Sequence, residues 1–248
     1  MKRAYWEKMA RTYSEEIFDV LLHDRKGLIR AVIEAHASPR ATVMDIGCAI
    51  GKWVPVLAPA FKKVVAVDIS AENLAIAADR FARYTNVEYR RADMSGSRIR
   101  VPRCDFGICI NAILTPNAAD RRRFFRNLGA CVKSGGRIVL SIPSLESWML
   151  TQVIQQEYGL NRAYFPPTRS GPEAIRKWNQ IRRAVADIDE VPHKHYMQEE
   201  LHHLFREVGF IVEDIQKLEY EWNTEFHRPP KKLKGPGPWD WMCVVRKK

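Results

Sequence analysis

The sequence lacks the features of a membrane or secreted protein. No apolar run approaches the ~18 residues that a membrane-spanning helix needs. The N-terminal region carries Glu7, Glu15 and Glu16 where a secretion signal would need an apolar core. Internal repeats and low-complexity tracts are also missing. With 248 residues, 46% hydrophobic and 28% charged, the chain is typical of a globular protein, and we expect a single domain over residues 1–248.

Cysteine is scarce, and its spacing suits neither a disulfide framework nor a zinc site. The five cysteines are odd in number and contain no Cys-x-x-Cys pair. This pattern argues against a disulfide framework and against a zinc site, and it is typical of reduced thiols. We therefore expect a cytoplasmic protein.

Positive charge is abundant and unevenly distributed. The formal net charge is +11, and residues 90–137 hold eleven lysines and arginines against three aspartates. A nucleic-acid-binding surface has this composition. A solvated face of an Arg-rich helix has it too, and no aromatic residue is interleaved with the arginines from Asp120 until Phe124. We favour the solvated face and keep the nucleic-acid surface as an alternative.

Apolar runs and helix signals alternate along the first part of the chain. Two helices are expected before the first strand, within residues 4–22 and 25–37. Ser70 and Asn117 are good N-caps for two later helices, over 71–84 and up to residue 132. Strands with short connections predict a parallel sheet with helices on both faces. The expected strands are 42–46, 63–67, 87–91, 105–110 and 137–142.

The alternation stops after Ser144. Residues 145–197 contain two helical patterns, about 146–159 and 172–187, around the prolines 166 and 167. We interpret this segment as a helical insertion that caps a substrate at the carboxyl edge of the sheet. A helix over 198–208 and strands over 210–220 and 241–246 follow, and the two strands are expected to form an antiparallel hairpin at the sheet edge.

A glycine-containing loop follows the first expected strand. A dinucleotide site needs Gly-x-Gly-x-x-Gly, so that backbone amides reach a pyrophosphate. Here the spacing is Gly47-x-Ala49-x-Gly51, and residue 52 is lysine. S-adenosylmethionine has no phosphate, so its loop need only let the backbone pass close under the methionine group. The carboxylate of Asp68, at the end of the second strand, would bind the ribose hydroxyls.

Several motifs in order resemble one enzyme family. The chain resembles the class I S-adenosylmethionine-dependent methyltransferases, in particular the small-molecule group that includes the ubiquinone and menaquinone biosynthesis enzymes. The resemblance implies a doubly wound, seven-stranded, mostly parallel α/β sheet of Rossmann-like type. The matching segments are 45–51, 65–70, 91–94 and 132–137, with weaker matches at 6–13 and 200–210.

The resemblance also implies a set of cofactor-binding residues. The methionine end of S-adenosylmethionine would be lined by Asp45, Gly47, Cys48, Ala49 and Gly51, and the ribose would be bound by Asp68. Around the adenine, Ile69 would lie beside the ring, Asp93 would accept from its amino group, and Met94 would pack on it. The site would be closed by Asn111 after strand four, by Tyr13, and by the N-terminal helices of residues 1–38. Ala49 departs from the family's usual glycine, and its methyl group narrows the loop.

Methyl transfer places few demands on side chains. The reaction is an in-line displacement at an activated carbon, so the protein mainly supplies proximity and alignment. A general base is needed only when the acceptor holds its proton at neutral pH. The candidates are His193, His195 and Tyr196, followed by Tyr164 and Glu157. His193-x-His195 lacks a third ligand at a useful spacing, so we expect no metal.

The acceptor is the least determined part of the prediction. Five of the seven tryptophans follow Ser144, which suits either an aromatic or apolar small molecule or a core between insertion and sheet. Residues 111–114 are not the Asn/Asp-Pro-Pro-aromatic element of enzymes that methylate exocyclic amines. We predict a small-molecule acceptor. The alternatives are an RNA-modifying enzyme that uses the basic 90–137 region and a non-catalytic S-adenosylmethionine-binding protein, and the oligomeric state stays open.

Overall fold

The fold is that of a computed structural model of the whole chain. The structure describes residues 3–10, 18–160, 183–188 and 191–248. Tyr13 and Tyr164, which the sequence proposed for the cofactor and for the acceptor, lie outside the described residues. No helix of the described segments is long and apolar enough to cross a membrane.

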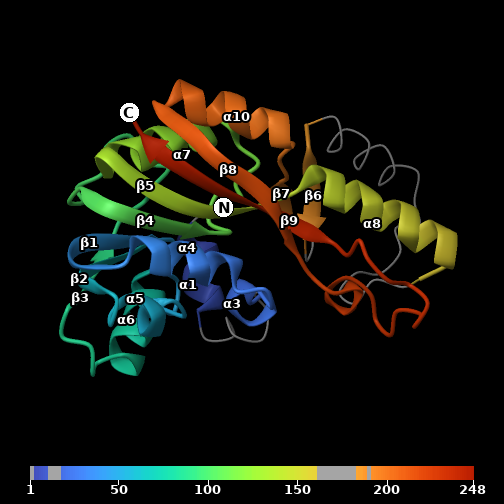
Figure 1. The fold of residues 1–248 in the computed structure, drawn as a ribbon, viewed down its shortest axis with the longest axis horizontal. Helices are drawn as coiled ribbons and strands as arrows, with labels where there is room; N and C mark the ends of the chain where they lie inside the picture. The colour runs from blue at the N-terminus through green and yellow to red at the C-terminus, as the bar shows by residue number, and fades with distance from the viewer. Residues whose placement is uncertain (1–2, 11–17, 161–182, 189–190) are drawn as a thin grey trace.

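A seven-stranded sheet forms the centre of the molecule (Figure 1). Its strand order is β3-β2-β1-β4-β5-β9-β8. The first five strands pair in parallel, whereas β9 is antiparallel to both β5 and β8. The predicted α/β class and the predicted C-terminal hairpin are therefore confirmed. The strands are β1 (Ser38–Ile46), β2 (Phe61–Asp68), β3 (Val87–Arg91), β4 (Cys104–Ile110), β5 (Val132–Pro143), β8 (Phe210–Glu219) and β9 (Trp239–Lys247).

Local sequence signals set the starts of several helices. Ser70 caps α6 by accepting from the Asn73 amide, and the Asn117 side chain caps α7 by accepting from two amides. Helix α5 is a single turn with Pro55 near its start, where the missing amide of proline breaks no helical hydrogen bond. The described helices are α1 (Arg3–Met9), α3 (Val20–His23), α4 (Leu28–His36), α5 (Val54–Leu57), α6 (Ala71–Arg80), α7 (Ala118–Ala130), α8 (Leu145–Tyr158), α10 (Gln198–Glu207) and the 3-10 turn η1 (Trp222–Thr224).

Apolar side chains on the two faces of the sheet form two buried layers. Because successive strand residues point to opposite faces, Val43 packs in the layer that contains α4 and α5, whereas Met44 packs in the layer that contains α7 and α10. Both side chains are fully buried. Figure 1 shows α7 and α10 on one side of the sheet and α4 on the other. Helices on both faces leave the carboxyl edge of the parallel strands free to carry the site.

The insertion after β5 is only partly helical. Its first helix is α8, as predicted, but β6 (Val185–Ile188) pairs in antiparallel fashion with β7 (Val191–Lys194). The prediction of a helix to residue 187 is therefore wrong at 185–187, in a strand that begins and ends with the β-branched residues Val185 and Ile188, which favour strands. Residues 172–182 of that predicted helix lie outside the described segments. The hairpin is anchored at the sheet edge by bonds from Lys194 N to Leu114 O and from Leu145 N to Tyr196 O.

Candidate active site

The glycine loop, residues 47–51, connects β1 to the single turn of α5. The amides of Gly47 and Cys48 both donate to the Val67 carbonyl of β2, at 2.8 and 3.0 Å. Gly47, Ala49 and Gly51 have φ angles of 78°, 45° and 77°. Residues with a Cβ rarely adopt this left-handed region, and for alanine it costs roughly 1–2 kcal/mol. Ala49, the residue that departs from the family pattern, is therefore also the strained residue of the loop.

The two glycines permit close approach to neighbouring elements. A Cβ on Gly47 would lie 2.5 Å from Cβ of Ala112, and one on Gly51 would lie 3.0 Å from Cβ of Ala77. The loop is thus pressed against α6 on one side and against the segment after β4 on the other. The backbone of the loop therefore lies at the carboxyl edge of β1, β2 and β4.

Asp68 ties the end of β2 to the glycine loop. Its Oδ2 accepts from the Ala49 amide at 2.9 Å and its Oδ1 accepts from the Ser70 amide at 2.8 Å. Burial raises the pKa of this carboxyl group, and the hydrogen bonds oppose that effect. A carboxylate offers about four acceptor positions, so capacity for a ribose hydroxyl remains.

Asp45 is a buried carboxyl group under the same loop. It is 1% exposed, and its Oδ2 has no hydrogen-bond partner. Burial and then the nearby charge of Asp68 raise the pKa of Asp45 to about 8. A buried acceptor without a partner is uncommon and costly. The ammonium group of a methionine moiety would supply the missing donor, so the loop and Asp45 fit S-adenosylmethionine.

A cavity of about 490 Å³ adjoins the ends of β2 and β3. It brings together Ile69 and Asp93, the two residues expected around the adenine. Met94, expected to pack on the ring, is instead 5% exposed and belongs to the hydrophobic core. Asp93 Oδ1 also accepts from the Ser95 amide at 2.8 Å. The cavity is lined by Arg3, Ile69, Asp93, Ser95, Gly96, Ser97, Asp120 and Arg123.

Helix α1 closes this cavity from the N-terminal side. Glu7 accepts from the Ser70 hydroxyl at 2.8 Å and from the Ala71 and Glu72 amides at 3.1 and 3.0 Å. These bonds lower the pKa of Glu7, with the Glu72 amide as the largest cause. A carboxylate at a helix N-terminus is favoured because it meets unpaired amides and the positive end of the dipole. Sequence reasoning missed both Glu7 and Arg3, since only the fold brings α1 to α6.

A polar cluster lies on the other side of the loop, at the ends of β4 and β5. The Asn111 side-chain amide donates to Oδ2 of Asp240 at 2.9 Å, and the Tyr220 hydroxyl donates to the same oxygen at 2.9 Å. Ser141 Oγ lies 2.9 Å from Asn111 Oδ1 and 3.2 Å from Asp240 Oδ2, as donor to one of them. We expected Asn111 to close the cofactor pocket, but its amide points to the start of β9 instead.

Asp240 combines burial with one free acceptor. It is 8% exposed, and burial raises its pKa while its three hydrogen bonds oppose that rise. Its Oδ1 accepts no hydrogen bond from the described residues and is not fully enclosed. Ala112, next to Asn111, touches Gly47, so the cluster adjoins the glycine loop. Sequence reasoning missed Asp240, although a lone acidic residue between Trp239 and Trp241 at the start of an apolar strand was a usable signal.

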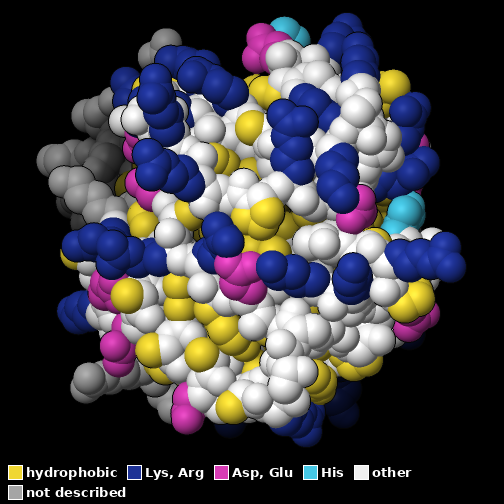
Figure 2. Space-filling model, turned by 90° about the vertical axis from the view of Figure 1, so that its left-hand side faces the viewer, with side chains coloured by type: hydrophobic (Ala, Val, Ile, Leu, Met, Phe, Trp, Pro, Cys, Tyr) yellow, Lys and Arg dark blue, Asp and Glu magenta, His cyan; other side chains and the backbone are white. Residues whose placement is uncertain are grey.

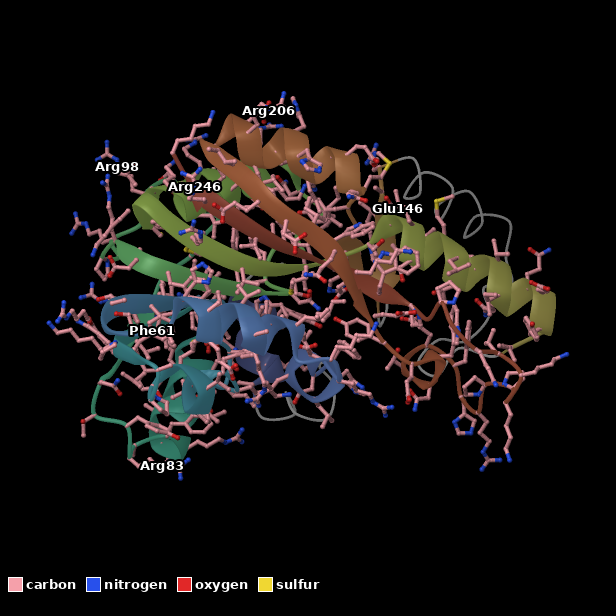
Figure 3. The ribbon with its side chains drawn as sticks, in the orientation of Figure 1. Phe61, Arg83, Arg98, Glu146, Arg206 and Arg246 are labelled. Carbon is pink, nitrogen blue, oxygen red and sulfur yellow. The ribbon has the colours of Figure 1, made fainter. Side chains whose placement is uncertain are left out.

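The residues predicted as catalytic lie elsewhere in the insertion. Tyr196 is fully buried in the hydrophobic core, and its hydroxyl donates to the Ile113 carbonyl at 3.0 Å. Burial raises the pKa of Tyr196, and this phenol is closed to an acceptor, so the prediction for it is corrected. Glu157, on α8, is exposed. Glu146 begins α8 beside β9 (Figure 3) and lies 3.4 Å from Nε1 of Trp241.

His193 and His195, two of the candidate bases, are both buried. Each is 6% exposed, and the His195 ring lies 6.4 Å from the ring of Trp148. Neither contacts the glycine loop through a bond that the structure shows, so a catalytic role for either residue stays a prediction. Within the described residues, no group of three His, Cys, Asp or Glu side chains could hold a metal ion.

Comparison with known proteins agrees with this geometry. Residues 43–136 match the family model described as "Methyltransferase domain". The chain is 27% identical over 198 residues to "Ribosomal RNA small subunit methyltransferase A" of Thermotoga neapolitana, which covers 75% of this chain and 74% of that protein.

Solved structures share the fold over nearly the whole chain. A SAM-dependent methyltransferase from Anabaena variabilis superposes with a TM-score of 0.66 and 15% identity, covering 99% of this chain and 93% of that one. The N-methyltransferase NodS from Bradyrhizobium japonicum, solved with S-adenosyl-L-homocysteine, superposes with a TM-score of 0.57 and 11% identity, covering 90% of this chain and 85% of that one. Residues 43–136 therefore carry a methyltransferase domain, on a fold that the chain shares with S-adenosylmethionine-dependent methyltransferases. The enzyme class and the cofactor predicted from the motifs are confirmed by these findings.

Proposed function

We propose that the enzyme methylates a small molecule that carries an N–H or O–H group. The acceptor would bind at the carboxyl edge between the glycine loop and Asp240. The observation that carries the proposal is the free Oδ1 of Asp240, an ionisable acceptor that is linked to the loop through Asn111 and its neighbour Ala112. A carboxylate in this position can take a proton from the acceptor or pair with a protonated amine.

The residues of this chain divide the work between two sides of the site. S-adenosylmethionine supplies a methyl group already activated by its sulfonium. On the donor side, Asp68 and Asp45 orient the ribose and the ammonium group. On the acceptor side, Tyr220 and Asn111 fix the Asp240 carboxylate, so that Oδ1 faces the acceptor. Alignment of this kind contributes up to about 7 to 11 kcal/mol in well-oriented reactions.

The expected aromatic or apolar acceptor has little support from the tryptophans. Trp222, Trp239 and Trp241 are 5–7% exposed and pack within the protein. Their rings therefore serve the core rather than an open acceptor surface. The insertion of residues 145–197 remains our candidate for a cap over the acceptor, because α8 and β7 are both anchored at the carboxyl edge.

The test is methyl transfer by the purified protein to a panel of small amines, phenols and carboxylates, with mass detection of the product. Transfer to at least one amine or phenol, lost in Asp240→Asn, supports the proposal. Transfer that Asp240→Asn leaves unchanged would sink it. The non-catalytic alternative predicts that S-adenosylmethionine binds without transfer to any acceptor.

RNA is the second candidate acceptor. The specific observations in its favour are the similarity to a ribosomal RNA methyltransferase and the excess of cations in residues 90–137. Retention on RNA at about 150 mM salt, with a steep loss on raising the salt, would favour it. We also propose a cytoplasmic location, which the five free and buried cysteines support.

A further inference from the structure

A groove of about 950 Å³ lies at the amino edge of the sheet, opposite the glycine loop. Helices α7 and α10 and the end of β9 form its walls. Figure 2 views this end of the molecule, where Lys and Arg side chains surround a hollow. We call it the amino-edge groove. Its lining includes one acidic residue, Glu207, and five basic residues: Arg103, Arg122, Arg126, Lys247 and Lys248.

The arginines of α7 fall into two groups with different partners. Arg121 donates to the Thr115 and Pro116 carbonyls, and Arg123 donates to Ser95 O and forms an ion pair with Asp120. Arg122 and Arg126, four residues apart and so on one helix face, line the groove. The Arg-rich run is therefore not one uniform solvated face: half of it is structural and half faces the groove.

The groove cations lack neutralising partners. Arg103, Arg122 and Arg126 are exposed, and none of them pairs with a carboxylate of the described segments. Glu207, the single acidic lining residue, instead lies 3.1 Å from Nε2 of His203. Like charges held together repel one another, so an anion in the groove would be stabilised.

Lys247 is a half-buried cation of the groove. Its ammonium group donates to the Val208 carbonyl at 2.8 Å and lies over the Phe210 ring, 5.2 Å from its centroid. These contacts fix it at the groove wall. Burial and then the charge of Arg103 lower the pKa of Lys247. A phosphate placed between Lys247 and Arg103 would raise the pKa of Lys247, because its negative charge would offset the charge of Arg103.

We infer that the amino-edge groove is a docking surface for the phosphodiester backbone of RNA. The cations come from α7, from β9 and from the loop before β4, so they suit a chain of phosphates better than a single anion. Further arginines extend the cationic surface, since Arg98 and Arg206 point away from the sheet (Figure 3). The inference rests on the RNA candidate above for the choice of RNA over DNA.

A membrane surface is the less suitable partner. Membrane-bound basic surfaces combine cations with exposed apolar side chains that insert between lipids. The exposed large hydrophobic residues of the described segments all lie outside the groove lining; they are Phe18, Leu22, Met149, Val153, Met197 and Ile211.

The experiment measures binding of the whole protein to a fluorescent 30-nucleotide single-stranded RNA of mixed sequence. The test variant is Arg122→Glu/Arg126→Glu. The matched control is Arg30→Glu/Arg80→Glu, which changes the charge equally at two exposed arginines outside the groove. We expect the test variant to bind at least tenfold more weakly at about 150 mM salt, with a shallower salt dependence. The control should stay within about threefold of the parent protein.

Each other result overturns the inference. Equal losses in both double variants would mean binding by net charge alone, and absence of RNA binding by the parent would remove the docking surface. Tighter binding of the same sequence as DNA, full competition by millimolar inorganic phosphate, or preference for vesicles of anionic lipid would name another occupant.

A thermal shift with S-adenosylhomocysteine, retained in both double variants, shows that the fold and the donor site are intact. Failure of methyl transfer to small molecules is a separate result. It would contradict the proposed acceptor and leave the groove measurement unaffected.

Discussion

The Tyr220 hydroxyl donates a 2.9 Å hydrogen bond to Oδ2 of Asp240, across the two strands that close the sheet. The bond opposes the effect of burial on Asp240, because a donor stabilises the ionised carboxylate. Burial, and then the Asp240 charge, raise the pKa of Tyr220 itself. The phenol therefore remains a donor at neutral pH, and the carboxylate keeps its other oxygen for the acceptor.

Replacement of Asp240 by Asn should lower kcat/KM for methyl transfer by roughly 10²- to 10⁴-fold, the range for a lost general base. Binding of S-adenosylhomocysteine should be unchanged, because Asp240 lies on the acceptor side. Calorimetric titration and initial rates would separate the two effects. A parallel loss of cofactor binding would place Asp240 in the donor site instead.

Replacement of Tyr220 by Phe should move the pH profile of methyl transfer. The base must be ionised, so activity rises with pH through the pKa of Asp240. Loss of the Tyr220 donor raises that pKa further, and the rising limb shifts to higher pH. Profiles of kcat/KM between pH 5 and 9 would show the shift. An unmoved limb with a uniform loss of rate would indicate a purely structural role for Tyr220.

Asp68→Ala should abolish the thermal shift produced by S-adenosylmethionine. It removes the ribose acceptor and also the bonds that hold the amides of Ala49 and Ser70. Asp93→Ala should weaken the shift only partly, since Asp93 lies on the open side of the cavity. NAD should give no shift with any of the three proteins. A shift given by NAD alone would overturn the cofactor assignment.

Asp45 should make the ligand-free protein less stable as the pH rises. Its pKa in the folded state is about 8, above the ordinary value of 3.8, so the folded state keeps a proton that the unfolded state releases. The stabilisation is full below pH 4 and is lost as the pH approaches 8, with a slope of at most about 1.4 kcal/mol per pH unit. Denaturant unfolding between pH 5 and 8 should show a flatter slope for Asp45→Asn. Equal slopes in the two proteins would contradict this assignment.

Ala49→Gly should relax the glycine loop. Relief of the left-handed conformation, worth roughly 1–2 kcal/mol, exceeds the roughly 0.4–1 kcal/mol that the added freedom of glycine costs in the unfolded chain. We expect an increase of up to about 1.6 kcal/mol in the free energy of unfolding. Ala49→Val should lower that free energy and weaken binding of S-adenosylhomocysteine. Greater stability of the valine variant would refute the strain argument.

Short-range features were predictable from the sequence, and long-range pairs were not. The five parallel strands follow from apolar runs, and the caps Ser70 and Asn117 follow from side chains two or three residues from their partners. The bond between Asn111 and Asp240 joins residues 129 apart, and the one between Glu7 and Ser70 joins residues 63 apart. Such pairs depend on the register of β9 against β5 and on the docking of α1, which no local pattern encodes. The same limit explains Tyr196, whose burial depends on its packing against Phe125.

Strand β9 also divides the enzyme into two parts that can change independently. The donor groups come from residues 45–93, whereas Asp240 and Tyr220 come from the β8–β9 hairpin, which joins the parallel strands only along β5. Substitution of that hairpin by one of the same length but different polar residues would leave the donor groups in place. Exchange of the hairpin is therefore a route to engineer a new methyl acceptor on an unchanged donor site.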